Sequence, residues 1–270
     1  MKYIIIKALL GFGDRLESLM MYTDYALKHN LIMCIDWSDP IWSDGNETFQ
    51  KYFELNMPQI ALEDIPSDLK VFPEFWKDKL DTKLTKEFMK ENNHLLDLGI
   101  ITDPFDCDIL VAVSSGLRIQ YTECSFFYNR LKIIHPEILE EIEKRRFVKD
   151  SIAIHLRGTD RIDTVYFKVR RIKQLQLKLM RNGVYDHKKV IVSDDQEFIR
   201  LWKQFDDSPV LSKKLPKSGP IHTTTCEYTK DELNIQLIID FITLSFCKEV
   251  FSTSEDSRFA KCAQKAKTFF

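Results

Sequence analysis

Cysteine is scarce in this sequence, and the few cysteines show no pairing pattern. The 270 residues include only six, at positions 34, 107, 124, 226, 247 and 262, and no two of them have the CxxC spacing of a zinc site. A disulfide scaffold is therefore excluded, and reduced thiols are expected.

Long apolar runs are also missing. No stretch reaches the roughly 18 residues that a membrane-spanning helix needs. Residues 2–10 are apolar, but Lys7 interrupts them and no small-residue cleavage site follows, so they predict a buried strand rather than a signal peptide. We expect a cytoplasmic protein without a transmembrane segment, which fits a bacterial or viral source.

An excess of charge of either sign is absent. Thirty-nine Lys and Arg residues face 41 Asp and Glu residues, a formal net charge of -2, while 44% of the residues are hydrophobic. The chain therefore lacks the overall basic field that nucleic acid binding exploits, and no nucleic acid partner is expected. It has enough apolar residues for a large core, which excludes global disorder.

What the sequence does contain is an alternation of strand and helix patterns. Strand patterns stand at 2–10, 31–36, 108–113, 151–155, 189–193, 209–211 and 249–252. Helix patterns stand at 15–29, near 80–91, and at 136–146, 170–181, 197–204, 231–246 and from 257 to the end. Strand-helix-strand units build parallel sheets with helices on both faces, so the fold class is α/β. A charged run before a fresh strand predicts two domains, residues 1–147 and 148–270.

Ligands of doubly wound sheets bind outside the carboxyl ends of the strands. Polar or glycine-containing segments follow four of the predicted strands here. These segments are Gly11-Phe12-Gly13-Asp14-Arg15, His155-Leu156-Arg157-Gly158-Thr159-Asp160, Ser193-Asp194-Asp195 and Ser252-Thr253-Ser254.

The first two segments suit anions. Gly11 and Gly13 allow a tight turn and a close approach to the amino terminus of the following helix, although a simple strand-to-helix turn would need them equally. The complete GxGxxG dinucleotide fingerprint is not met, which disfavours an NAD-dependent enzyme. Arg157 offers a planar fork of donors that matches phosphate oxygens.

Acidic residues and hydroxyls supply the remaining candidates. Asp194 and Asp195 suggest a metal pair, but Asp195 precedes a helix and equally serves as its cap, and no metal is predicted. Asp240 lies in an apolar helix and needs a donor, which is either a purine edge or a lysine or backbone amide. Ser252 and Ser257, at the last strand-to-helix junction, either bind phosphate or cap the helix.

The order and spacing of these motifs resemble the α1,6-fucosyltransferase superfamily, which includes rhizobial nodulation and core α1,6-fucosyltransferases. The resemblance rests on Gly-Phe-Gly-Asp-Arg, His-Leu-Arg-Gly-Thr-Asp, Val-Ser-Asp-Asp, and Ile-Ile-Asp with a Ser/Thr-rich junction twelve residues on. It implies a GT-B fold, with two Rossmann-like domains facing a cleft. It also implies inverting, metal-independent transfer of L-fucose from GDP-fucose to a glycan hydroxyl, with no cofactor besides the donor.

The resemblance also implies roles for single residues. Arg157 would hold the β-phosphate and stabilise the leaving GDP, while His155, through its backbone, and Asp240 would read guanine. The remaining donor-binding candidates are Gly11, Phe12, Gly13, Arg15, Arg161, Asp194, Asp195, Ser252, Thr253, Ser254 and Ser257.

Two departures from the family pattern stand out. Gly158 replaces the second of two consecutive arginines, and the acidic base of the core enzymes falls near Val165. Asp163 and Asp14 are the alternative candidates for the base.

The departures leave two other functions open. One is the same fold with another donor, such as UDP-xylose or GDP-rhamnose, and the other is a catalytically silent protein that binds nucleotides or glycans. The acceptor, the linkage and the oligomeric state are not predicted.

Overall fold

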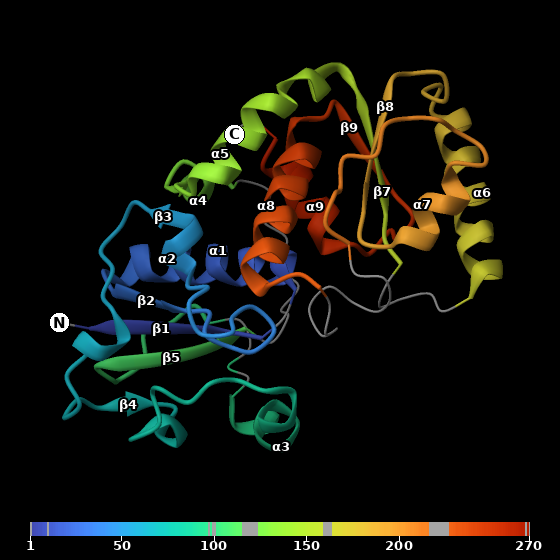
Figure 1. The fold of residues 1–270 in the computed structure, drawn as a ribbon. Coiled ribbons are helices and arrows are strands. Elements are labelled where there is room, and N and C mark those ends of the chain that lie inside the picture. The colour runs from blue at the N-terminus through green and yellow to red at the C-terminus, as the bar shows by residue number, and fades with distance from the viewer. Residues whose placement is uncertain are drawn as a thin grey trace. The chain divides into compact units, whose positions relative to one another are not determined.

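The computed structural model describes residues 2–9, 11–96, 98, 101–114, 124–158, 164–215, 227–267 and 269. The chain forms two compact units, Met1–His135 and Pro136–Phe270 (Figure 1). This division precedes the expected boundary after residue 147, because helix α5 (Pro136–Arg145) packs on helix α8 (Lys230–Phe246) of the second unit. Each unit has a parallel sheet of its own, so the predicted α/β class is confirmed.

The amino-terminal sheet has the strand order β2-β1-β5-β4. Its strands are β1 (Tyr3–Ala8), β2 (Ile32–Asp36), β4 (Val71–Phe72) and β5 (Ile109–Ser114). The central strand β1 is buried along its whole length, as expected of a parallel strand covered on both faces. That burial explains why its sequence is a nearly continuous apolar run.

Helix α1 (Phe12–His29) packs on β1 and β5, and its Tyr22 hydroxyl donates to the Val113 carbonyl at 3.3 Å. Tyr3, Ile5 and other alternate residues of the sheet pack with Trp76 in a hydrophobic core cluster. The remaining elements of this unit are α2 (Phe49–Tyr52), β3 (Phe53–Leu55), η1 (Leu62–Asp64), η2 (Glu74–Trp76), α3 (Lys86–Leu96), α4 (Ser125–Tyr128) and β6 (Leu131–Ile133). Strands β3 and β6 pair antiparallel.

The carboxyl-terminal sheet has the order β8-β7-β9, with all neighbours parallel. Its strands are β7 (Ile152–Leu156), β8 (Lys189–Ser193) and β9 (Glu249–Ser252). The strand expected at 209–211 is not formed, since Val210 makes only an isolated bridge to Ile191.

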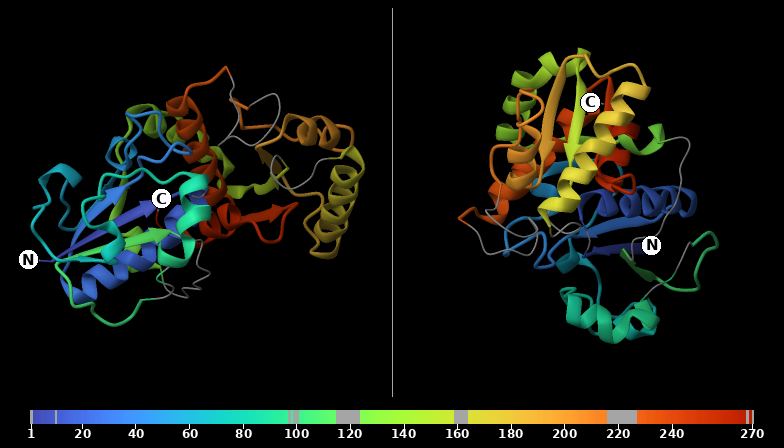
Figure 2. Two further views of the ribbon diagram at one scale, coloured as in Figure 1. Left: turned by 90° about the horizontal axis from the view of Figure 1, so that it is seen from below. Right: turned by 90° about the vertical axis from the view of Figure 1, so that its right-hand side faces the viewer.

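Helices cover both faces of this second sheet. Alternate residues of β7, beginning with Ile152, pack against α6 (Val165–Arg181) and α7 (Gln196–Trp202). The views from the side agree that α6 lies along one face of β7, with α8 and α9 (Arg258–Lys265) on the other (Figure 2). A short 3₁₀ helix, η3 (Arg146–Asp150), connects α5 to β7. Among the helices of the described residues, none is both long and apolar enough to cross a membrane.

Candidate functional site

The carboxyl ends of β7, β8 and β9 bring together residues from three of the four predicted segments. Arg157 Nη1 lies 2.8 Å from Asp194 Oδ2, and the Gly158 backbone N–H donates to Asp194 Oδ1 at 2.9 Å. From the other side, Thr253 Oγ1 accepts the backbone N–H of Arg157 at 2.9 Å. We call Arg157, Gly158, Asp194, Asp195 and Thr253 the strand-end cluster.

Arg157 is the partly accessible cation of this cluster. Its side chain is 19% exposed, whereas that of Asp194 is 7% exposed. The aspartate therefore fixes the direction of the guanidinium at the edge of the sheet, where the planar set of N–H donors can still meet an anion. A phosphate group is the ligand that this geometry suits.

Asp195 is a helix cap held by a lysine. Its Oδ1 accepts the Phe198 backbone N–H at 2.9 Å at the start of α7, and its Oδ2 lies 2.6 Å from Lys168 Nζ. Of the two roles that the sequence left open, capping is therefore the observed one. Among the described residues, no group of three or more His, Cys, Asp or Glu side chains is arranged to hold a metal ion.

Lys168 was not identified from the sequence, although a signal was present. It continues the buried face of α6, whose other members are Ile172, Leu175 and Leu179. A lysine at a core position of an amphipathic helix requires a buried partner, and Asp195 is that partner.

Gly158 is required by close packing rather than by backbone conformation. A Cβ atom at this position would lie 2.4 Å from Asp195 Oδ2 and 2.6 Å from Phe198 Cδ2. Both contacts are shorter than real Cβ contacts, and both neighbours are held in place, Asp195 by Lys168 and Phe198 by burial. The structure thus gives a physical reason why no arginine stands at this position.

His155 lies inside the unit, below the strand-end cluster. Its Nδ1 is 3.0 Å from Ser252 Oγ, and its ring centroid is 5.6 Å from that of Phe259 in α9. Burial, reinforced by the positive charge of Arg157, lowers the pKa of His155 to about 3, so the imidazole is neutral. The His155 carbonyl accepts the Thr253 backbone N–H at 3.0 Å.

The hydroxyl-rich junction after β9 is internally bonded. Ser252 Oγ accepts the Ser254 backbone N–H at 3.1 Å, and Ser257 Oγ accepts the Ala260 N–H at 3.4 Å at the start of α9. The helix-capping role that the sequence allowed for Ser257 is therefore observed. Thr253 is the residue of this junction that contacts Arg157.

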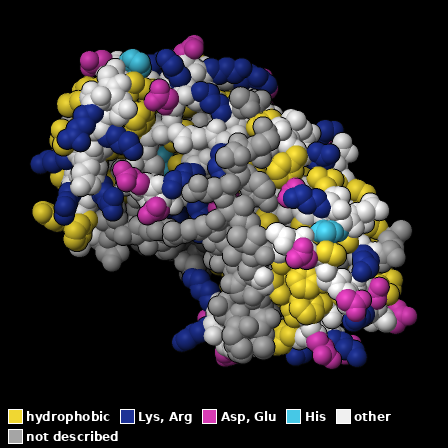
Figure 3. All heavy atoms as spheres, turned by 180° about the vertical axis from the view of Figure 1, so that it is seen from behind, with side chains coloured by type: hydrophobic (Ala, Val, Ile, Leu, Met, Phe, Trp, Pro, Cys, Tyr) yellow, Lys and Arg dark blue, Asp and Glu magenta, His cyan; other side chains and the backbone are white. Residues whose placement is uncertain are grey.

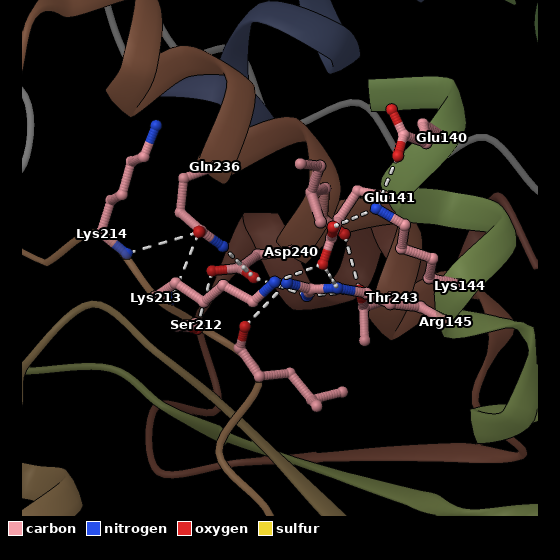
Figure 4. Close-up of polar contacts among 12 residues, drawn as sticks. Glu140, Glu141, Lys144, Arg145, Ser212, Lys213, Lys214, Gln236, Asp240 and Thr243 are labelled. Atoms are coloured by element: carbon pink, nitrogen blue, oxygen red, sulfur yellow. Dashed lines mark hydrogen bonds and ion pairs between the residues drawn. The ribbon is translucent and has the colours of Figure 1, made fainter. Parts of the chain in front are cut away.

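Asp240 is bound by an arginine, so the donor that its buried carboxylate requires is a side chain of the protein. Arg145 Nη1 lies 3.3 Å from Asp240 Oδ1, Gln236 Nε2 donates to the same oxygen at 2.7 Å, and Ser212 Oγ donates to Oδ2 at 2.7 Å (Figure 4). Burial raises the pKa of Asp240 to about 6, although Arg145 and the two hydrogen bonds act in the opposite direction. The carboxylate thus has donors within its own unit.

Arg145 was missed because it lies in a charged run. It is nevertheless buried, on the same face of α5 as Ile138 and Ile142. Its guanidinium also donates to Thr243 Oγ1 at 3.1 Å and to the Leu211 carbonyl at 2.8 Å (Figure 4). The helical spacing of these three positions was the signal that could have identified it.

The Gly11–Arg15 segment belongs to the amino-terminal unit, where it begins α1. Phe12 is buried, with its ring stacked 5.9 Å from that of Trp42. Arg15 is also buried, with Nη2 2.8 Å from Asp39 Oδ1 and its guanidinium over the rings of Trp37 and Trp42. The two side chains expected to bind the donor therefore contribute to the core of this unit.

The rest of that segment is placed at the helix start. Gly11 is the N-cap residue of α1. Gly13 is buried, and Asp14 is partly buried in the first turn of the helix. Two further predicted residues, Arg161 and Asp163, lie outside the described residues.

Comparison with known proteins defines the fold class. No protein-family model matches the chain, and no curated protein matches it in sequence. Solved structures do match over nearly its whole length. They show that the chain has a GT-B fold, as the family resemblance implied.

The particular structures are fucosyltransferases. NodZ α-1,6-fucosyltransferase co-crystallised with GDP matches with a TM-score of 0.72 and 18% identity, covering 98% of this chain and 92% of that one. The enzyme from Bradyrhizobium gives a TM-score of 0.73 at 18% identity, covering 98% and 93% of the two chains. A variant of Arabidopsis thaliana FUT1 in complex with GDP gives 0.55 at 14% identity, covering 98% and 68%.

Proposed function

We propose that this protein is a glycosyltransferase that moves L-fucose from GDP-fucose to a hydroxyl of a glycan acceptor. The observation that carries the proposal is the strand-end cluster, in which Asp194 and Thr253 hold Arg157 at the carboxyl end of β7. The similarity in fold to NodZ with bound GDP supports the same donor.

The reaction proposed is a single displacement. The acceptor oxygen attacks the anomeric carbon of fucose while the bond from that carbon to the β-phosphate oxygen breaks, so the configuration inverts and GDP leaves with the electron pair. The acceptor proton passes to a carboxylate, for which Asp163 and Asp14 are the candidates. Negative charge grows on the diphosphate as the bond breaks, and this is the charge that a fixed cation stabilises.

Arg157 would supply that cation without a metal ion. Its guanidinium is already oriented by Asp194, so little reorganisation accompanies the reaction. The hydroxyls of Ser252, Thr253 and Ser254 are proposed as further contacts to the phosphates. Asp240 and the backbone of His155 are proposed to select guanine.

The guanine assignment has to be separated from the structural role of Asp240. Asp240→Asn keeps the shape of the side chain and an oxygen for Arg145 or Ser212, but removes the charge. We expect this variant to lose its preference for GDP over UDP while remaining folded. An unchanged preference in a folded variant overturns this assignment and leaves UDP-xylose or another donor open.

Transfer itself is tested with radiolabelled GDP-fucose and a panel of oligosaccharide acceptors, in the presence of EDTA. Arg157→Ala should abolish transfer, whereas Arg200→Ala, an exposed arginine paired with Glu197 on α7, should not affect it. Binding of GDP without turnover on any acceptor would instead identify a catalytically silent nucleotide-binding protein.

A further inference from the structure

The first turn of α6 exposes hydrophobic side chains. Val165 is 51% exposed, Tyr166 70% and Phe167 51%, and the three are consecutive in the chain. A run of exposed apolar residues is unfavourable in water and marks a surface that binds something. In Figure 3, hydrophobic side chains lie along the left edge of the molecule, among basic ones.

The rest of α6 has the ordinary amphipathic pattern. Its buried face continues through Ile172, Leu175 and Leu179, and exposed positions such as Arg170 and Arg171 are basic. The two aromatic residues of the first turn, Tyr166 and Phe167, are therefore not needed to attach the helix to the sheet. The centroids of the two rings lie 5.5 Å apart, and the ring planes meet at 73° in an edge-to-face arrangement. The faces of the two rings therefore point in different directions.

A contact of the next residue joins the turn that carries Tyr166 and Phe167 to the strand-end cluster. Phe167 is followed directly by Lys168, whose Nζ binds Asp195 at 2.6 Å, and Asp195 follows Asp194, the partner of Arg157. Thr164 Oγ1 accepts the Phe167 backbone N–H at 3.4 Å and fixes the start of the helix. The rings thus stand on a turn that is anchored to the strand-end cluster.

We infer that Tyr166 and Phe167 form a binding surface for the acceptor saccharide, an inference that rests on the proposed function. A pyranose ring has a face of C–H groups, which packs on the electron-rich face of an aromatic ring, while its hydroxyls remain in water. Two rings on one rigid turn suit an oligosaccharide that lies next to the sugar of the donor.

The alternative occupant of an aromatic and basic surface is a membrane. A helix that lies in a membrane interface presents apolar residues along its length at helical spacing. Here three exposed hydrophobic residues are consecutive in the first turn, and the basic residues Arg170, Arg171 and Lys173 separate them from Leu177 and Met180, which are exposed near the end of the helix. The pattern therefore favours a compact ligand such as a saccharide.

The test compares the full chain with the Tyr166→Ala/Phe167→Ala variant in the presence of GDP. Saturation-transfer NMR and NMR titration measure binding of chitotetraose, cellotetraose and maltotetraose, and sedimentation measures binding to vesicles of phosphatidylcholine and phosphatidylglycerol. Leu177→Ala is the matched control, because Leu177 is 52% exposed on the same helix, three turns away. Thermal unfolding verifies that the variants are folded.

We expect at least one oligosaccharide to bind the wild type, with a loss of roughly fivefold or more in affinity in the double variant and none in the control. Equal affinities, no binding of any of the three, or vesicle binding that alone depends on the rings would overturn the inference. The affinity for GDP should be the same in all three proteins. If the wild type does not bind GDP, it is the proposed function that fails.

Discussion

The guanidinium of Arg145 lies 3.3 Å from the carboxylate of Asp240, 95 positions further along the chain. Both side chains are buried, at 4% and 8% exposed, and they join α5 to α8. The pair explains why α5 belongs to the carboxyl-terminal unit although it precedes the first strand of that unit. It also leaves the stability of the unit dependent on a charge pair without access to solvent.

Removing one partner of this pair should destabilise the protein strongly. We expect Arg145→Met to lower the free energy of unfolding by about 3–5 kcal/mol, because Asp240 is left as an uncompensated buried charge. Adding Asp240→Asn to this variant removes that charge and should recover much of the loss. Guanidinium chloride unfolding of the wild type, both single variants and the double variant measures the coupling.

Arg146→Ala is the control for this experiment. Arg146 is the next residue, and its exposed guanidinium pairs with Glu143 three positions earlier on the surface. We expect no measurable change in stability from its removal. A variant at Arg145 that is as stable as the one at Arg146 would contradict the structural role of the pair.

The lowered pKa of His155 should be visible in the pH dependence of stability. In the folded chain its pKa is about 3, while the ordinary value is 6.5, so below pH 6.5 the unfolded chain binds a proton that the folded chain does not. The stabilisation from this group is complete above pH 6.5 and is lost as the pH falls toward 3. Between pH 7 and pH 5 the wild type should lose about 2 kcal/mol more than His155→Gln.

The contribution of Asp240 to stability depends on pH in the opposite direction. Its pKa of about 6 in the folded chain lies above the ordinary value of 3.8, so its contribution to stability is complete below pH 3.8 and is lost as the pH rises through about 6. Asp240→Asn should therefore change the pH profile in the direction opposite to His155→Gln. Denaturant unfolding across this range measures both, and equal slopes in all three proteins would refute the two assignments.

Gly158→Ala tests the packing at the strand-end cluster. The added methyl group would collide with Asp195 Oδ2 and Phe198 Cδ2, so we expect a loss of about 1–3 kcal/mol together with weaker GDP binding. Gly183→Ala is the contrasting variant. A Cβ atom at Gly183 would meet no other atom, but the backbone φ there is +68°. The substitution should therefore lower stability through backbone strain alone and leave GDP binding unchanged.

If Gly158→Ala is as stable as the wild type and binds GDP equally well, the cluster is looser than the distances indicate. If the added methyl group instead displaces Asp195, the contact of Asp195 with Lys168 is weakened as well. Because Lys168 is buried beside Asp195, that loss should be visible as a lower melting temperature.

The sequence predicted the α/β class because its strands are buried on both faces and its helices have a strong period. It also predicted which strand ends carry polar residues, since a strand end is visible as the place where the apolar run stops. Residues 209–211 were wrongly predicted as a strand, because a short apolar run is not sufficient to form a ladder.

Pairings across the chain were harder to predict. Arg145 and Lys168 are single charges among many, and their burial depends on partners 95 and 27 positions away. Their positions on apolar helix faces indicate that each needs a partner, but not which one. The burial of Phe12 and Arg15 likewise depends on Trp37, Trp42 and Asp39, which the motif alone does not contain.

Arg157 is proposed to form a site for a guanine nucleotide diphosphate. The decisive measurement is isothermal titration of the wild type, Arg157→Ala and Arg200→Ala with GDP, GDP-fucose and UDP, each with EDTA and with a divalent metal. We predict that the wild type and Arg200→Ala bind GDP and GDP-fucose equally with and without metal and bind UDP more weakly. Arg157→Ala should lose about tenfold or more in affinity, as expected when a charged hydrogen bond is removed. Tighter binding of UDP, or an Arg157→Ala variant that binds GDP as well as the wild type, would rule out a guanine nucleotide site at Arg157.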